Sequence, residues 1–510
     1  MEIFSSLVFW RRRKKPLEIP NFAAEFFVLQ DHLDSCFFRK HCVTDLRKRL
    51  AQYTNAALNL ESLFKLMMRA SHLCLYLPAT SLRTGRTIEE LESKIRRLVI
   101  DKTWITALKY IVSPLCEEEN LSCEGEYLVT PEVRVARLLD VLVHKLEEGY
   151  GEVLLEQDVL SVLFDLHLHF SVSNPRISNA VLKALCNIAL QSQKCAAAIA
   201  RSEWLHLLSS LMSSGTLEEK LLSEKICVNA LSTFIPGGGP RLRRNIYQLY
   251  CSDEEPVMDI IFIHGLKGSV FRTWREKDDL SKLHRTRCWP KDWLPKDLSV
   301  PARILAIDYS SSLVQFTSKS ETLSSRSQSF LIQLKEAQVG IRPVVFICHS
   351  MGGLLAKTLL LDDKSLLKQT LGILFFATPH QGSPLAKYAY ITLRPAEDVR
   401  LLRYKNAVNK KLHDEFLLVT HEVPIITSVL ETEEALLPLR RKGILVPWES
   451  AFFEYGSVYH VKEVSSFFHK VPVPDLSHHN VCKPRSRTDN IYKVVTQFLG
   501  DAAYHINKKK

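Results

Sequence analysis

The residues with the clearest chemical potential lie at positions 343–357, which read PVVFICHSMGGLLAK around Ser350. An apolar, β-branched run comes first, a sharp turn follows at the serine, and a helical leucine pattern comes next. Strand, tight turn and helix are the context in which α/β proteins present a nucleophilic serine. Because strand and helix approach closely there, the positions two before and two after the serine need small side chains. Gly352 meets this need, and Cys348 stands where glycine is usual.

A serine hydroxyl is a weak nucleophile until a base accepts its proton, so the chain should also supply a histidine and an orienting acid. With this kind of turn, the order along the chain is serine, acid, histidine. We expect Glu431, at the end of a predicted strand, to be the acid, with Glu449 as the alternative. We expect His478 to be the base, because its polar loop precedes a final amphipathic helix, with His479 as the alternative.

An attacked carbonyl develops negative charge on its oxygen, which backbone N–H groups can stabilise. The residue after the nucleophile supplies one such donor, and a loop after an earlier strand supplies another. We therefore predict an oxyanion hole formed by the N–H groups of Met351 and Leu266, the latter directly after His264-Gly265. An ordinary turn at a strand end is the alternative interpretation of His264-Gly265.

Five apolar segments of the C-terminal half are typical of buried strands: residues 257–263, 302–309, 343–348, 371–378 and 423–430. Helical patterns lie between them, as at 325–337 and 354–367, and an amphipathic helix is predicted at 488–499. Apolar strands that alternate with helices predict a mainly parallel sheet covered on both faces. Functional groups of such sheets gather at the carboxyl ends of the strands, where the predicted site residues stand.

The N-terminal half shows helical periodicity instead. Similar apolar helices surround Asn187 and Asn229, which lie 42 residues apart, within the period of armadillo or HEAT repeats. Such repeats form a concave surface for a protein partner, and the alternative is a helical domain that only packs against its neighbour. The expected organisation has five parts: a basic N-terminal segment (1–20), a helical region (21–125), armadillo-like repeats (126–235), a Gly/Pro-rich linker (236–244) and an α/β domain (245–505).

Composition narrows the function classes. The net charge of +11 favours anionic surfaces such as a membrane leaflet, but no basic patch is interleaved with aromatics, so we expect no nucleic-acid partner. Twelve cysteines without metal-type spacing indicate reduced, intracellular thiols, and we expect neither a metal nor a cofactor. The sequence contains no run of about 18 apolar residues, so no transmembrane helix is predicted. The N-terminal MEIFSSLVFWRRRKK is compatible with a targeting or membrane-surface segment.

The region from about Val257 to Leu499 resembles the serine active site-containing protein family of lipase-like α/β-hydrolases. The matching blocks are FIHGL (262–266) with TWR (273–275), CWPK (288–291) with WL (293–294), HSMGGLL (349–355), PH (379–380) with GS (382–383), ESA (449–451), and His478 with Asn480, Cys482, Lys483 and Pro484. The helical segment before the linker is also similar to that family's. His478 and Glu431 match the family's histidine and acid, and its members often lack the glycine that Cys348 replaces.

This resemblance implies an α/β-hydrolase fold and a serine-dependent hydrolase or acyltransferase that acts on a lipid ester, such as an anionic phospholipid. It links the protein to phosphatidylglycerol remodelling at mitochondrion–endoplasmic reticulum contacts and to intracellular cholesterol distribution, with peripheral membrane contact. Two alternatives stay open. One is a non-catalytic scaffold at organelle membrane contacts that binds a partner through the helical repeats, and the other is a peptidase or general esterase with the same triad.

Overall fold

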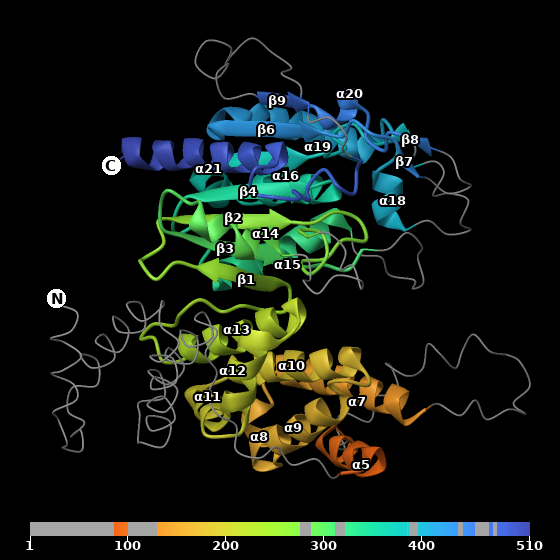
Figure 1. Cartoon of the computed structure of the whole chain (residues 1–510), viewed down its shortest axis with the longest axis vertical. Coiled ribbons are helices and arrows are strands. Elements are labelled where there is room, and N and C mark those ends of the chain that lie inside the picture. Colours follow the sequence, from red (N-terminus) through yellow and green to blue (C-terminus); the bar gives the residue numbers. More distant parts are fainter. Residues whose placement is uncertain are drawn as a thin grey trace, which may run out of the picture.

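The computed structural model of the chain describes residues 86–99, 130–275, 287–311, 322–384, 386, 396–436, 442–453, 469–472 and 477–509. The predicted basic segment at 1–20 and most of the helical region predicted at 21–125 lie outside these residues. The described residues form a helical half and a half built on a β-sheet, which lie one below the other in Figure 1.

The helical half contains α5 (Ile88–Val99), α7 (Pro131–Glu147), α8 (Gly151–Glu156), α9 (Val159–Phe170), α10 (Pro175–Ala189), α11 (Gln193–Ala200), α12 (Trp204–Ser214) and α13 (Leu217–Ser232). Local sequence defines where these helices begin. Pro131 opens α7 directly after the N-cap Thr130, and Thr216 and Glu219 form a capping box at α13. Helix α10 packs between α7 and α13. The structure thus confirms a helical region, and its armadillo-like character stays a prediction.

The second half is organised by a sheet of seven strands in the order β1-β3-β2-β4-β5-β6-β9. The strands are β1 (Ile246–Cys251), β2 (Met258–Ile263), β3 (Ala302–Ile307), β4 (Val344–His349), β5 (Thr370–Phe376), β6 (Ile425–Leu430) and β9 (His469–Pro472). Only β1 runs antiparallel to its neighbour, β3, and every other pair is parallel. The five predicted strands are confirmed as β2 to β6, whereas the two edge strands β1 and β9 were not predicted.

The helices of this half are α14 (Trp289–Asp292), α15 (Leu323–Glu336), α16 (Met351–Asp362), α17 (Lys364–Gln369), α18 (Glu397–Leu401), α19 (Ala407–Val419), α20 (Trp448–Ala451) and α21 (Asn490–Lys509), and a small hairpin joins β7 (Ala435–Leu436) and β8 (Lys442–Gly443). The single helix predicted at 354–367 is wrong. Its two parts separate at Asp363, whose side chain accepts the N–H groups of Ser365 and Leu366 and so begins a new helix.

Both faces of the sheet are covered, and for this reason every residue of β2 to β6 is buried. Helices α15, α16 and α19 share an apolar cluster with one face, and α21 packs on β5 and β6 at the other. A second cluster runs from the helical half, past β1, to the face beneath α21. The carboxyl ends of β4, β5 and β6 therefore lie together at one edge of a rigid, buried sheet.

Candidate active site

Ser350 occupies the sharp turn between β4 and α16, which is the predicted setting. Its backbone has φ 53° and ψ −126°, a conformation that residues with a side chain rarely adopt. Its N–H donates to the carbonyl of Phe376, 2.8 Å away, which holds the turn against β5. A methyl group at Gly352 would come within 2.4 Å of the Ile263 carbonyl oxygen, so the expected need for a small residue is confirmed there. Cys348 is fully buried on the strand side.

The structure brings His478 and Glu431 to this serine. His478 Nε2 lies 3.0 Å from Ser350 Oγ, and His478 Nδ1 lies 3.2 Å from Glu431 Oε2. The three side chains come from the β4–α16 turn, the loop ahead of α21 and the end of β6, and all three residues are buried. The two sequence alternatives, Glu449 on α20 and His479, are both exposed, unlike these three residues.

The environment of Glu431 suits an orienting carboxylate. Its Oε1 accepts the N–H of Val446, which fixes the carboxylate plane beside the histidine. The His478 Nδ1 contact is within ion-pair distance but does not meet the geometry of a hydrogen bond. Catalytic hydrogen bonds are often long or poorly aligned without substrate and tighten when it binds.

The turn that holds Leu266 lies directly against the nucleophile. A methyl group on Gly265 would come within 2.7 Å of Ser350 Cβ, so this glycine permits the close approach of the two segments. In the described part of the chain, neither Leu266 N–H nor Met351 N–H donates to a main-chain carbonyl in a loop, turn or cap. Both groups therefore remain the best candidates for the oxyanion donors.

His264 stabilises that turn through hydrogen bonds. Its Nε2 accepts the N–H of Tyr309 at 3.1 Å, its Nδ1 donates to the Gly265 carbonyl at 2.9 Å, and its own carbonyl accepts the Tyr309 hydroxyl at 2.7 Å. The two rings stack with centroids 4.3 Å apart. All polar groups of this buried imidazole are occupied, so its role is to fix the turn before Leu266.

Sequence reasoning missed a role for His349, the residue before the nucleophile. Its Nε2–H donates to the carbonyl oxygen of His478, 2.9 Å away, and therefore ties the histidine loop to the β4–α16 turn. Burial, together with the neighbouring His478, lowers the pKa of His349 well below its ordinary value, so the ring is neutral. Nothing in the local sequence marks this contact, because the two residues are distant along the chain.

A second buried basic group lies behind the serine on α16. Lys357 is fully buried, and its Nζ lies 3.0 Å from Nδ1 of His413 on α19. Burial lowers the pKa of Lys357 well below its ordinary value. Burial and the adjacent lysine lower the pKa of His413 to about 3. These groups pack among Phe416 and Phe453 and support the helix that follows the nucleophile.

A mainly parallel, doubly covered sheet, with a serine at a strained strand–helix turn and an acid and a histidine after later strands, defines a lipase-like α/β-hydrolase domain. Consistently, residues 255–411 match the PGAP1-like alpha/beta domain. The chain is 31% identical to Protein SERAC1 of Danio rerio over 357 residues, which cover 64% of this chain and 52% of that protein. It is 30% identical to Protein SERAC1 of Homo sapiens over 355 residues, which cover 64% and 51%.

Residues 255–411 therefore match a PGAP1-like alpha/beta domain, and the chain is similar to the SERAC1 proteins, which confirms the resemblance that its sequence motifs predicted. It spans about half the length of the curated relatives that it matches. Among solved structures, the lipase BlEst2 of Bacillus licheniformis in its mature form is similar at 18% identity, over 36% of this chain and 69% of that one, with a TM-score of 0.27. A score this low adds nothing to the fold assignment, which rests on the sheet topology and the domain match.

Proposed function

We propose that the protein is a serine-dependent hydrolase or acyltransferase of lipid esters. The observation that supports this proposal best is the alignment of Ser350 Oγ, the His478 imidazole and the Glu431 carboxylate at distances of 3.0 and 3.2 Å. Nucleophile, base and orienter occur here in the order and geometry that acyl transfer requires. The domain match and the SERAC1 homologues supply the lipase-like context.

The chemistry follows from these positions. Ser350 Oγ attacks the ester carbonyl carbon while His478 Nε2 takes the hydroxyl proton, and Glu431 stabilises the resulting imidazolium. The N–H groups of Leu266 and Met351 stabilise the oxyanion of the tetrahedral intermediate. Collapse of the intermediate expels the alcohol, which receives the proton from His478 and leaves an acyl group on Ser350. Water, or the hydroxyl of a second lipid, then takes up the acyl group as His478 removes its proton.

An anionic phospholipid is the substrate class we favour, with phosphatidylglycerol as its representative. The net charge of +11 and the family resemblance support this choice, and they support peripheral contact with an anionic membrane at mitochondrion–endoplasmic reticulum contacts. A role in intracellular cholesterol distribution would follow indirectly from phospholipid remodelling there. Among the described residues, no helix combines the length and apolarity needed to cross a bilayer.

A fluorophosphonate probe tests the nucleophile directly, because it reacts only with an activated serine. We expect the full chain in mild detergent to be labelled, and Ser350→Ala to lose all labelling. Ser365→Ala is the matched control, since Ser365 is exposed on α17 and should leave labelling intact. If folded wild-type protein takes up no probe, the catalytic proposal fails and the scaffold alternative gains support.

Vesicles test the substrate class. The wild-type protein should release fatty acid, or transfer it between lipids, faster from phosphatidylglycerol vesicles than from phosphatidylcholine vesicles. Ser350→Ala should do neither. Equal rates on both vesicles would refute the headgroup preference and leave the serine mechanism standing.

A further inference from the structure

The turn that carries Leu266, here called the oxyanion turn (264–270), is fixed by the segment that follows β3 (308–311). Two of the contacts are the hydrogen bonds of Tyr309 with the ring and the carbonyl of His264. In the other two, side chains of the segment accept main-chain N–H groups of the turn: Val270 to Asp308 Oδ1 at 3.0 Å, and Lys267 to Ser311 Oγ at 2.8 Å. Because these bonds are spread over the whole turn, its position follows that of the 308–311 segment.

Arg326 on α15 holds that segment from one side. Its Nη2 donates to the Ser310 carbonyl at 3.2 Å, and its guanidinium lies over the Tyr309 ring, 5.4 Å from the centroid. The guanidinium is buried and forms a two-pronged ion pair with Asp398 on α18, at 2.6 and 3.1 Å. Such a pair is costly to separate, because each partner would leave the other as an unpaired buried charge. Arg326 is therefore a firm support for the 308–311 segment.

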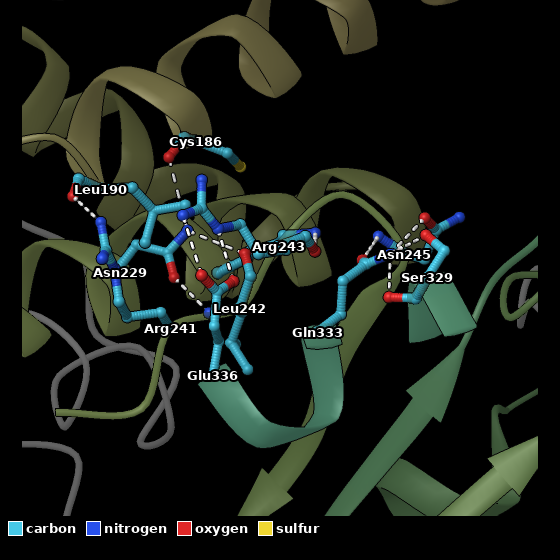
Figure 2. A network of polar contacts seen from close by, with 11 residues as sticks. Cys186, Leu190, Asn229, Arg241, Leu242, Arg243, Asn245, Ser329, Gln333 and Glu336 are labelled. Carbon is cyan, nitrogen blue, oxygen red and sulfur yellow. Dashed lines mark hydrogen bonds and ion pairs between the residues drawn. The ribbon is translucent and has the colours of Figure 1, made fainter. Parts of the chain in front are cut away.

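Asn245, at the end of the linker, holds the segment from another side. Its Nδ2 donates to the Asp308 carbonyl at 2.6 Å, and its own carbonyl accepts the Asp308 N–H at 2.8 Å. Gln333 of α15 fixes Asn245 in turn, as Figure 2 shows: its Oε1 accepts the Asn245 N–H at 3.0 Å, and its Nε2 donates to Asn245 Oδ1 at 3.1 Å. Helix α15 thus supports the segment twice, directly through Arg326 and indirectly through Asn245.

The linker residues before Asn245 are bound to both halves of the protein. Lys225 on α13 donates to the carbonyls of Arg243 and Arg244, at 2.6 and 3.0 Å. The Arg243 guanidinium donates to both carboxylate oxygens of Glu336 on α15, at 2.6 and 3.0 Å (Figure 2). The place of Asn245 is therefore set by the way the helical half docks on α15.

We propose that Asn245 and Arg326 are positioning residues for the oxyanion hole. Both act through the 308–311 segment, which sets the place of the Leu266 N–H relative to the developing oxyanion. A misplacement of about 1 Å in such a site can cost about 10²-fold in rate. The inference rests on the proposed function, because it concerns the transition state of acyl transfer at Ser350. It also gives the helical half a part in catalysis, since the docked helical half fixes Asn245.

Two substrates that differ in one atom test this role on the full chain. A nitrophenyl ester develops negative charge on oxygen when attacked, whereas its thionoester develops the charge on sulfur, a weak hydrogen-bond acceptor. Misplaced oxyanion donors should therefore slow the ester more than the thionoester. We expect Asn245→Ala and Arg326→Gln to lower kcat about tenfold or more on the ester and less than about threefold on the thionoester. Equal losses on the two substrates, or no loss on either, would overturn the proposal.

Two control variants separate this effect from lost stability and from a displaced base. Arg303→Gln breaks another buried arginine–aspartate pair, with Asp259 at 2.8 and 3.0 Å, at the amino ends of β2 and β3. It should leave the ratio of ester to thionoester rates unchanged. His349→Ala, which releases the His478 loop, should lower both rates alike. A ratio that falls as far in Arg303→Gln as in Arg326→Gln would refute the positioning role. Asn245→Ala, at a half-buried residue, keeps the test decisive if an arginine variant does not fold.

Hydrogen–deuterium exchange adds a measurement that needs no turnover. Peptides covering residues 264–270 should exchange faster in Asn245→Ala and Arg326→Gln than in the wild-type protein, and at the wild-type rate in Arg303→Gln. Unchanged exchange in the first two variants would overturn the inference even in an active enzyme. A wild-type protein that hydrolyses neither substrate would overturn the proposed function and the catalytic role of the two residues with it, whereas faster exchange would still confirm that they hold the turn.

Discussion

Replacement of Ser350 by glycine should stabilise the protein relative to replacement by alanine. Ser350 holds φ 53° and ψ −126°, which strains any residue that has a Cβ atom, and glycine adopts it freely. Both substitutions remove the Oγ contact with His478, so that loss cancels in the comparison. What remains is the backbone strain at the turn.

The size of the difference follows from two opposing effects. A strained backbone of this kind costs about 1–3 kcal/mol, which glycine recovers. Glycine also loses more conformational freedom on folding, at a cost of about 0.5–1 kcal/mol relative to alanine. With the middle of each range, about 2 and about 0.75 kcal/mol, the net difference is about 1 kcal/mol in favour of Ser350→Gly. In a domain of this size each kcal/mol moves the melting temperature by about 2–4 °C, so Ser350→Gly should melt about 2–4 °C higher than Ser350→Ala.

Thermal and urea unfolding of the two variants, followed by circular dichroism, measure this difference. Ser365 provides a control of opposite sign, because it lies in the first turn of helix α17 and has no positive φ, so glycine there should be less stable than alanine by up to about 1 kcal/mol. If Ser350→Gly proves no more stable than Ser350→Ala while the Ser365 pair behaves as stated, the turn holds no strain and the reasoning fails.

Three further predictions concern the residues around the serine. Glu431→Gln should lower the rate of labelling and of ester hydrolysis by about 10²–10⁴-fold, whereas the exposed Glu449→Gln should leave both unchanged; the reverse result would exchange their roles. His349→Ala should reduce kcat by about 10-fold or more by releasing the His478 loop, and His349→Gln, whose amide N–H can still donate, should restore most of it; equal losses would refute a positioning role. The folded pKa of His413, about 3, lies below its ordinary 6.5, so the unfolded chain takes up the proton first. The stability that the neutral histidine contributes is therefore complete above pH 6.5 and is lost as the pH falls toward 3. The urea midpoint of the wild-type protein should fall between pH 7.5 and pH 5, and the fall should be smaller in His413→Gln. Identical dependence of the midpoint on pH in the two proteins would contradict this prediction.

Much of the fold could be read from the sequence because the buried strands are continuous apolar runs, and such runs specify parallel strands. The edge strands were missed for physical reasons. β1 contains Gln248 within its apolar pattern, and β9 is short and ends in Pro472, so neither resembles a buried strand.

The order of Ser350, Glu431 and His478 along the chain could also be predicted, because the strand–turn–helix context limits where an acid and a histidine can stand. The choice between Glu431 and Glu449 needed the structure, since burial separates them and periodicity does not. The contact of His349 with the His478 carbonyl depends on the way two distant segments pack. No local pattern records such a contact.

The apolar cluster shared by the two halves affects how the chain is made and maintained in the cell. The helical half leaves the ribosome first, and α13 stays uncovered until β1 and its sheet have formed. A chain cut between the halves would expose apolar surface on both fragments, which quality-control proteases recognise. We therefore expect damaging substitutions in the helical half to reduce the amount of intact protein without changing the probe labelling of Ser350 in the molecules that survive.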